Sequence, residues 1–104
     1  MRSVLLAAQD RRAVITVPTV VIAEWWRVDT KIPRLILARV NVEPLNEHLA
    51  KIAGTALAAV PGATVVDAIV MASAAQRGDA VFTSDIDDLD RLRAHFPGVR
   101  LFRV

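Results

Sequence analysis

The spacing of apolar and polar residues predicts two consecutive helices in the middle of the chain. In 47–60 the apolar positions recur every three or four residues and form one face, and Asn46 is suited to cap the start of this helix. A second helix, apolar nearly all round, is expected from Thr64 as its cap to about Gln76. Gly78 is placed to end it, because glycine readily adopts the left-handed conformation found after helices.

Short runs rich in β-branched and aromatic residues predict strands on both sides of these helices. Each run is five or six residues long, and Pro18, Pro44, Asp85 and Gly98 stop or bound them. The runs are "AVITV" (13–17), "VNVEPL" (40–45), "AVFTS" (80–84) and "VRLFRV" (99–104).

Further helices are expected between the strands and at the amino end. Residues 2–10 resemble the last turns of a helix, and 33–40 and 85–96 have the composition of short helices. Pro18 suits the first turn of a helix that is capped near Thr16 and runs through "TVVIAEWWR".

Strands that alternate with helices predict an α/β fold, a three-layer α/β/α sandwich with a mainly parallel sheet. The 104 residues suit one domain, 1–104, and 54% of them are hydrophobic, which is enough for a core. The apolar runs are too short for a membrane span or a secretory signal. The chain has no cysteine, which fits a reducing compartment, so we expect a cytoplasmic protein without membrane contact.

The charge balance permits nucleic acid as a partner without requiring it. The formal net charge is +2, and eleven of the thirteen cations are arginine, which favours bidentate contacts with phosphate. The alternative is an ordinary solvated surface.

Three carboxylates stand out, Glu24, Asp67 and Asp85, and each has a structural alternative. Thr64 and Asp67 have the spacing of a capping box, Ser84 and Asp85 could cap the next helix, and Glu24 could lie on a solvated face. Their joint placement favours a functional site, because ligands of open parallel sheets bind beyond the carboxyl ends of strands. Oxygen ligands without nearby histidine or cysteine suit Mg²⁺ or Mn²⁺, which activate water and hold phosphates.

Three stretches carry a resemblance to a known family. "VPTVVIAEWWR", "VEPLNEHLAKIAG" and "TVVDAIVMASAAQRGDAVFTSDIDDL" resemble the PIN domain, especially the VapC-type toxins of toxin–antitoxin pairs, and the likeness extends over about residues 3–104. The resemblance implies a parallel sheet between helices and a Mg²⁺- or Mn²⁺-dependent endoribonuclease. It also implies an RNA substrate and a cognate antitoxin protein as partners.

The resemblance assigns roles to individual residues. Asp67 and Asp85 match the family's metal-binding aspartates, and Glu24 matches the glutamate that positions the ion or the water. Asp88 falls where some members have a further acid. The supporting residues are Thr83 and Ser84, with Arg27 as a candidate for the RNA backbone.

The chain departs from the family pattern at its amino end. PIN domains begin with a central strand that ends in a metal-binding aspartate and is followed by a helix, whereas "MRSVLLAAQDRR" matches the helix after this strand–helix unit. Without the first strand and helix, we expect open backbone edges in the sheet and self-association as a dimer or larger.

Three explanations for this departure stay open. In the first, the start is set downstream of the true one, or the chain is a fragment. In the second, a second copy of the chain covers the gap. In the third, the protein is a non-catalytic module that binds an antitoxin, a second copy or RNA. A more distant alternative is an unrelated small α/β domain whose acids are only helix caps.

Overall fold

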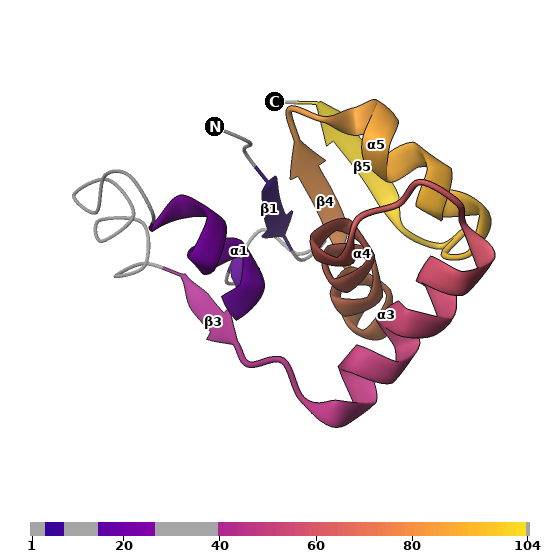
Figure 1. Ribbon diagram of the computed structural model, residues 1–104. Helices are drawn as coiled ribbons and strands as arrows, with labels where there is room; N and C mark the ends of the chain where they lie inside the picture. Colours follow the sequence, from indigo (N-terminus) through magenta and orange to yellow (C-terminus); the bar gives the residue numbers. More distant parts are fainter. Residues whose placement is uncertain (1–3, 8–14, 27–39, 104) are drawn as a thin grey trace.

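The computed structural model describes residues 4–7, 15–26 and 40–103, in which five strands form one sheet in the order β3-β2-β1-β4-β5 (Figure 1). The strands are β1 (Val4–Ala7), β2 (Thr16–Pro18), β3 (Asn41–Glu43), β4 (Ala80–Thr83) and β5 (Arg100–Arg103). The helices are α1 (Thr19–Trp25), α3 (Glu47–Ala59), α4 (Val65–Arg77), α5 (Ile86–Asp90) and the 3₁₀ helix η1 (Arg91–Ala94). α1 contacts β2 and α4, and α5 lies beside β5 (Figure 1).

The described strands form a mixed sheet in which four of the five run the same way. β2 is parallel to β3 and β4 is parallel to β5, whereas β1 is antiparallel to both β2 and β4. The predicted α/β fold with a mainly parallel sheet is therefore confirmed, with one central strand reversed.

The prediction of a helix end at residues 2–10 is wrong for Val4–Ala7, which form β1. Val4 pairs with Thr83 and Ala7 with Ala80, and on the other side Leu6 pairs with Thr16. An apolar run of four residues fits a strand as well as a helix, so periodicity alone cannot decide between them. The strand is favoured here by its pairing with β2 and β4. Without β1, the backbone N–H and C=O groups on the inner edges of β2 and β4 would lack hydrogen-bond partners.

The same strand corrects the expectation of open edges in the centre of the sheet. Both β2 and β4 pair with β1, so in the described part of the chain the inner edges of these strands are covered. The resemblance implies a parallel strand ending in aspartate, whereas β1 is antiparallel and ends at Ala7.

Other elements differ from the expected ones in detail. Thr16 does not cap α1, because it is buried within β2, and the residue before α1 is Pro18, with φ −63° and ψ 143°. The expected helix at 85–96 is divided into α5 and η1. The expected helix at 33–40 falls almost wholly outside the described residues.

The caps of α3 and α4 confirm the predicted boundaries. Asn46 Oδ1 accepts a hydrogen bond from the backbone N–H of Leu49 at 2.8 Å, and Thr64 Oγ1 accepts one from Asp67 at 3.1 Å. Gly78 follows α4 in the left-handed conformation with φ 69°. The two helices pack along each other, so the central region of the chain forms as the sequence indicates.

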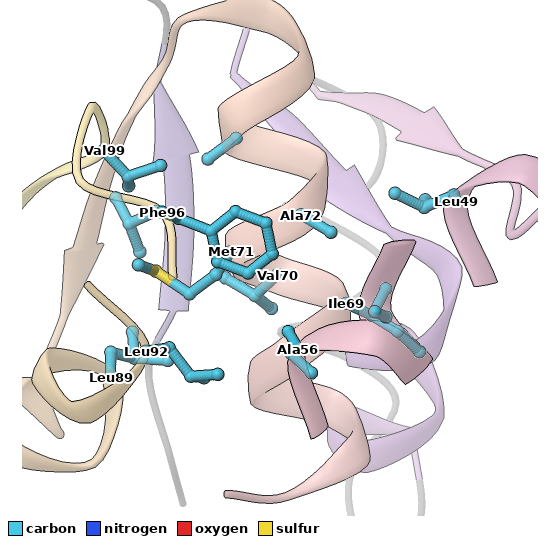
Figure 2. Close-up of a cluster of buried hydrophobic side chains, with 14 of the residues drawn as sticks. Leu49, Ala56, Ile69, Val70, Met71, Ala72, Leu89, Leu92, Phe96 and Val99 are labelled. Atoms are coloured by element: carbon cyan, nitrogen blue, oxygen red, sulfur yellow. The ribbon is translucent and has the colours of Figure 1, made fainter. Parts of the chain in front are cut away.

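The hydrophobic core is centred on α4, as Figure 2 shows. Met71 on this helix is 0% exposed, and residues from α3, α5, η1 and the loop before β5 close around it. These are Ala56, Leu89, Leu92, Phe96 and Val99, while Leu49 of α3 belongs to the same core on the other side of α4. In the ranges that the structure describes, none of the helices is long and apolar enough to span a membrane.

Candidate active site

Asp67 lies in the first turn of α4 and is almost completely buried, with 1% of its surface exposed. Its backbone N–H donates to the Thr64 hydroxyl, which is half of the predicted capping box. Its Oδ1 atom is closed off from solvent. Capping explains the backbone contact, but a cap residue has no need of a buried carboxylate, so burial sets Asp67 apart from an ordinary cap.

Asp85 follows β4 directly and is positioned by the strand's last residue. The Thr83 side chain is fully buried, and its Oγ1 accepts a hydrogen bond from the backbone N–H of Asp85 at 2.9 Å. Asp85 occupies the position before α5, but its side chain makes no capping hydrogen bond to that helix. Asp85 therefore occupies the N-cap position of α5, as the cap alternative expects, but its carboxylate does not cap the helix.

A pocket of about 190 Å³ opens at the carboxyl end of β4. Its walls come from the loop after β4, the start of α5 and the last residue of β5. They are Ser84, Asp85, Ile86, Asp87, Asp88 and Arg103. Arg103 reaches this position because it pairs with Thr83 in the sheet. Carboxylates facing a guanidinium can hold a cation and a phosphate in the same pocket.

Glu24 is half-buried on α1, a helix that contacts α4. Val21, one turn earlier on α1, belongs to the same core as Ala68 and Ile69 of α4. The fold therefore places the helix of Glu24 beside the helix of Asp67. Arg27 lies outside the described residues.

The described residues include no group of three or more acidic, histidine or cysteine side chains that could hold a metal ion. Glu24, Asp67 and Asp85 are therefore not gathered into such a group in this part of the chain. Mg²⁺ is usually bound through one or two carboxylates, completed by water and substrate phosphates. The oxygen donors at the pocket thus fit Mg²⁺ or Mn²⁺ in chemistry. Asp88 is exposed, and its Oδ1 lies 3.9 Å from Arg91 Nη2.

An ion-pair network at the other end of α4 was not expected from the sequence. Arg77 Nε donates to Asp79 Oδ2 at 2.7 Å, and Arg77 Nη1 donates to Glu43 at the end of β3. The buried Ser73 hydroxyl also donates to Glu43. Arg77 is ten residues from Asp67, about 15 Å along the helix axis, so the network is separate from Asp67.

A signal for part of this network was present in the sequence. Asp79 lies just beyond the glycine that ends α4, within reach of an arginine in the last helical turn. Glu43 is more than thirty positions from Arg77, and only the packing of α4 against the sheet brings the two together.

One comparison with known proteins, the one against family models, gave a match. No curated protein and no solved structure gave a significant match. The model of the PIN domain matches residues 2–94, and PIN domains are associated with nuclease-type function and generally use divalent metal ions. Because this match covers most of the chain, the protein belongs to the PIN domain family.

Proposed function

We propose that this protein is a VapC-type, metal-dependent endoribonuclease that hydrolyses RNA phosphodiesters at the pocket after β4. The observation that supports this most directly is the placement of Asp85. The buried Thr83 hydroxyl fixes the backbone of Asp85, and the guanidinium of Arg103 lies in the same pocket. This is the edge of the sheet where ligands of α/β folds bind.

Each acid has a role in the proposal. Asp67 and Asp85 hold Mg²⁺ or Mn²⁺, Glu24 positions the ion or the attacking water, and Asp88 is a weaker additional ligand. Thr83 and Ser84 support the loop, and Arg27 contacts the RNA backbone. When bound, the ion supplies a more acidic water and neutralises charge on the phosphate.

Arg103 adds a role that the resemblance did not assign. Its planar guanidinium can donate two hydrogen bonds to one phosphate, which orients the scissile group relative to Asp85. Such orientation is the part of the reaction that the chain's own residues perform, because hydrolysis requires the water and the leaving oxygen to be in line.

The proposal also names partners. A cognate antitoxin protein and a second copy of the chain are the protein partners, and RNA in the cytoplasm is the substrate. β1 occupies a central position in the sheet but contributes no carboxylate there.

A thermal melt with Mn²⁺ tests the metal site without requiring the correct RNA. At about 100 times its dissociation constant the ion adds roughly 2.7 kcal/mol to the free energy of unfolding. For a domain of this size that raises Tm by roughly 10–20 °C. Asp67→Asn and Asp85→Asn should lose the shift, and both should lose cleavage of a mixed RNA pool.

Asp90→Asn is the matched control. Asp90 is on the same short helix as Asp88 but lies outside the pocket, and its exposed carboxylate pairs with Arg93 at 3.1 Å. This variant should keep both the Mn²⁺ shift and cleavage. Cleavage retained in both Asp67→Asn and Asp85→Asn would refute the assigned roles.

A non-catalytic PIN module is the second candidate, and one observation favours it. The described residues do not gather three potential metal ligands. A module that only binds an antitoxin, a second copy or RNA would show no Mn²⁺ shift in the wild type. Its binding would also be insensitive to Asp85→Asn, which separates it from the nuclease.

A further inference from the structure

The outward face of the β4–β5 pair carries two stacked phenylalanines. Val81 and Leu101 pair across the strands and pack in the core, so Phe82 and Phe102, the next residues, lie on the opposite face. Their ring centroids are 5.2 Å apart with an interplanar angle of 23°. Phe102 is 42% exposed, which is unusual for a large aromatic side chain and leaves part of its ring open to a ligand.

Positive charge accompanies these rings. Arg100 lies two residues before Phe102 on the same face, with its guanidinium carbon 5.8 Å from the Phe102 ring centroid. In the described part of the chain the arginines of α4 and η1 are paired with carboxylates, whereas Arg100 and Arg103 of β5 are not. The strand therefore presents guanidinium groups that are available to an anionic partner.

We propose that Phe82, Arg100 and Phe102, here called the β4–β5 platform, bind single-stranded RNA. The inference rests on the proposed ribonuclease function, since it supplies the binding surface for the same substrate. Unpaired bases stack on exposed aromatic rings of a sheet, and arginine contacts the phosphates. In a duplex the base faces are already covered by their neighbours, so the platform should favour single strands.

The platform lies at the same end of the β4–β5 pair as the candidate active site, on the opposite face of the sheet. Arg103 follows Phe102 in β5 and lines the pocket that contains Asp85, and Thr83 follows Phe82 in β4 and fixes the backbone of Asp85. Because neighbouring side chains of a strand point to opposite faces, Arg103 lies on the face of Val81 and Leu101. RNA held on the platform therefore reaches the pocket around the carboxyl end of β5.

Binding can be measured without catalysis by fluorescence anisotropy in EDTA. The probe is a fluorescein-labelled, mixed-sequence single-stranded RNA of twelve nucleotides, compared with the same sequence as a duplex. Phe102→Ala in the full chain should weaken binding of the single strand by roughly 5- to 150-fold, the range found for loss of one stacked base. Phe102→Tyr should retain affinity because it keeps the ring.

Two further variants sharpen the test. Leu45→Ala is the matched control, because Leu45 is 44% exposed on the loop before α3, away from the platform, and its loss should not change affinity. Arg100→Gln should reduce the slope of log affinity against log salt by about one.

The outcomes separate this inference from the proposed function. Absence of binding by the wild type, unchanged affinity in Phe102→Ala, or an equal loss in Leu45→Ala would overturn the platform. A smaller oligomer of Phe102→Ala by light scattering, with RNA affinity unchanged, would identify the face as a contact with a second copy and also overturn it. Phe102-dependent binding without Mn²⁺-dependent cleavage would support the platform while refuting the nuclease. Mn²⁺-dependent cleavage together with RNA binding that does not depend on Phe102 would support the nuclease and refute the platform.

Discussion

Replacing Arg77 with methionine tests how much the ion-pair network at the end of α4 contributes to folding. The change leaves Asp79, whose side chain is 5% exposed, without the guanidinium that lies 2.7 Å from its Oδ2. Removing one partner of a fully buried pair destabilises by about 3–5 kcal/mol, whereas exposed pairs contribute about 0.2–1 kcal/mol. Arg77 is 27% exposed, so water partly replaces it, and we expect a loss of about 2 kcal/mol.

Urea denaturation and a thermal melt measure this loss. A decrease of about 2 kcal/mol should lower Tm by roughly 10 °C in a domain of this size. Arg93→Met is the matched control, since the Arg93–Asp90 pair is 3.1 Å long but its side chains are 49% and 60% exposed. It should change stability by less than about 0.5 kcal/mol.

A double-mutant cycle isolates the pair itself. Asp79→Asn combined with Arg77→Met should show a coupling free energy of about 1 kcal/mol or more, because both changes remove the same buried contact. Equal losses in Arg77→Met and Arg93→Met, or a coupling below about 0.3 kcal/mol, would refute the reasoning that burial gives this network its strength.

Urea denaturation checks four further changes. Met71→Ala removes a fully buried side chain from the centre of the core and should destabilise by about 2–5 kcal/mol, and a loss below 1 kcal/mol would contradict the packing around α4. Asn46→Ala should lose about 1 kcal/mol with the cap of α3, while Asn46→Asp should retain it. Gly78→Ala forces a side chain into a left-handed conformation and should lose about 1–2 kcal/mol. Leu6→Pro removes a backbone donor from a central strand and should lose about 3 kcal/mol or more, whereas tolerance of this proline would argue against β1.

The parts of the fold that could be predicted from sequence are those with local causes. The caps Asn46 and Thr64 and the terminator Gly78 act within one helical turn, so the bounds of α3 and α4 follow from neighbouring residues. The misassignment of Val4–Ala7 has a non-local cause. Its partner β4 is distant in sequence, and four apolar residues do not reveal that β2 and β4 need a third strand between them.

In the candidate site, too, the features with local causes could be predicted and those with non-local causes could not. The position of Asp85 after a strand and of Asp67 in a first helical turn could be predicted, because each depends on one element. The burial of Asp67 and the approach of Arg103 to the loop after β4 depend on the packing of α4 and the register of β5. The residue opposite Thr83 cannot be identified from sequence until that register is known.

The reversed strand β1 has a consequence for how the sheet assembles. Among the described strands, β1 is the sole backbone link between the pairs β2–β3 and β4–β5. Its pairing with β2 joins nearby residues, Leu6 and Thr16, whereas its pairing with β4 joins Val4 to Thr83. Closing so long a loop is entropically unfavourable and slow, so the pairing of β1 with β4 should form late on the folding pathway. α4 contacts both β2 and β4 and can hold the two pairs side by side before then. In kinetic terms, the junction between β1 and β4 is the last part of the sheet to close.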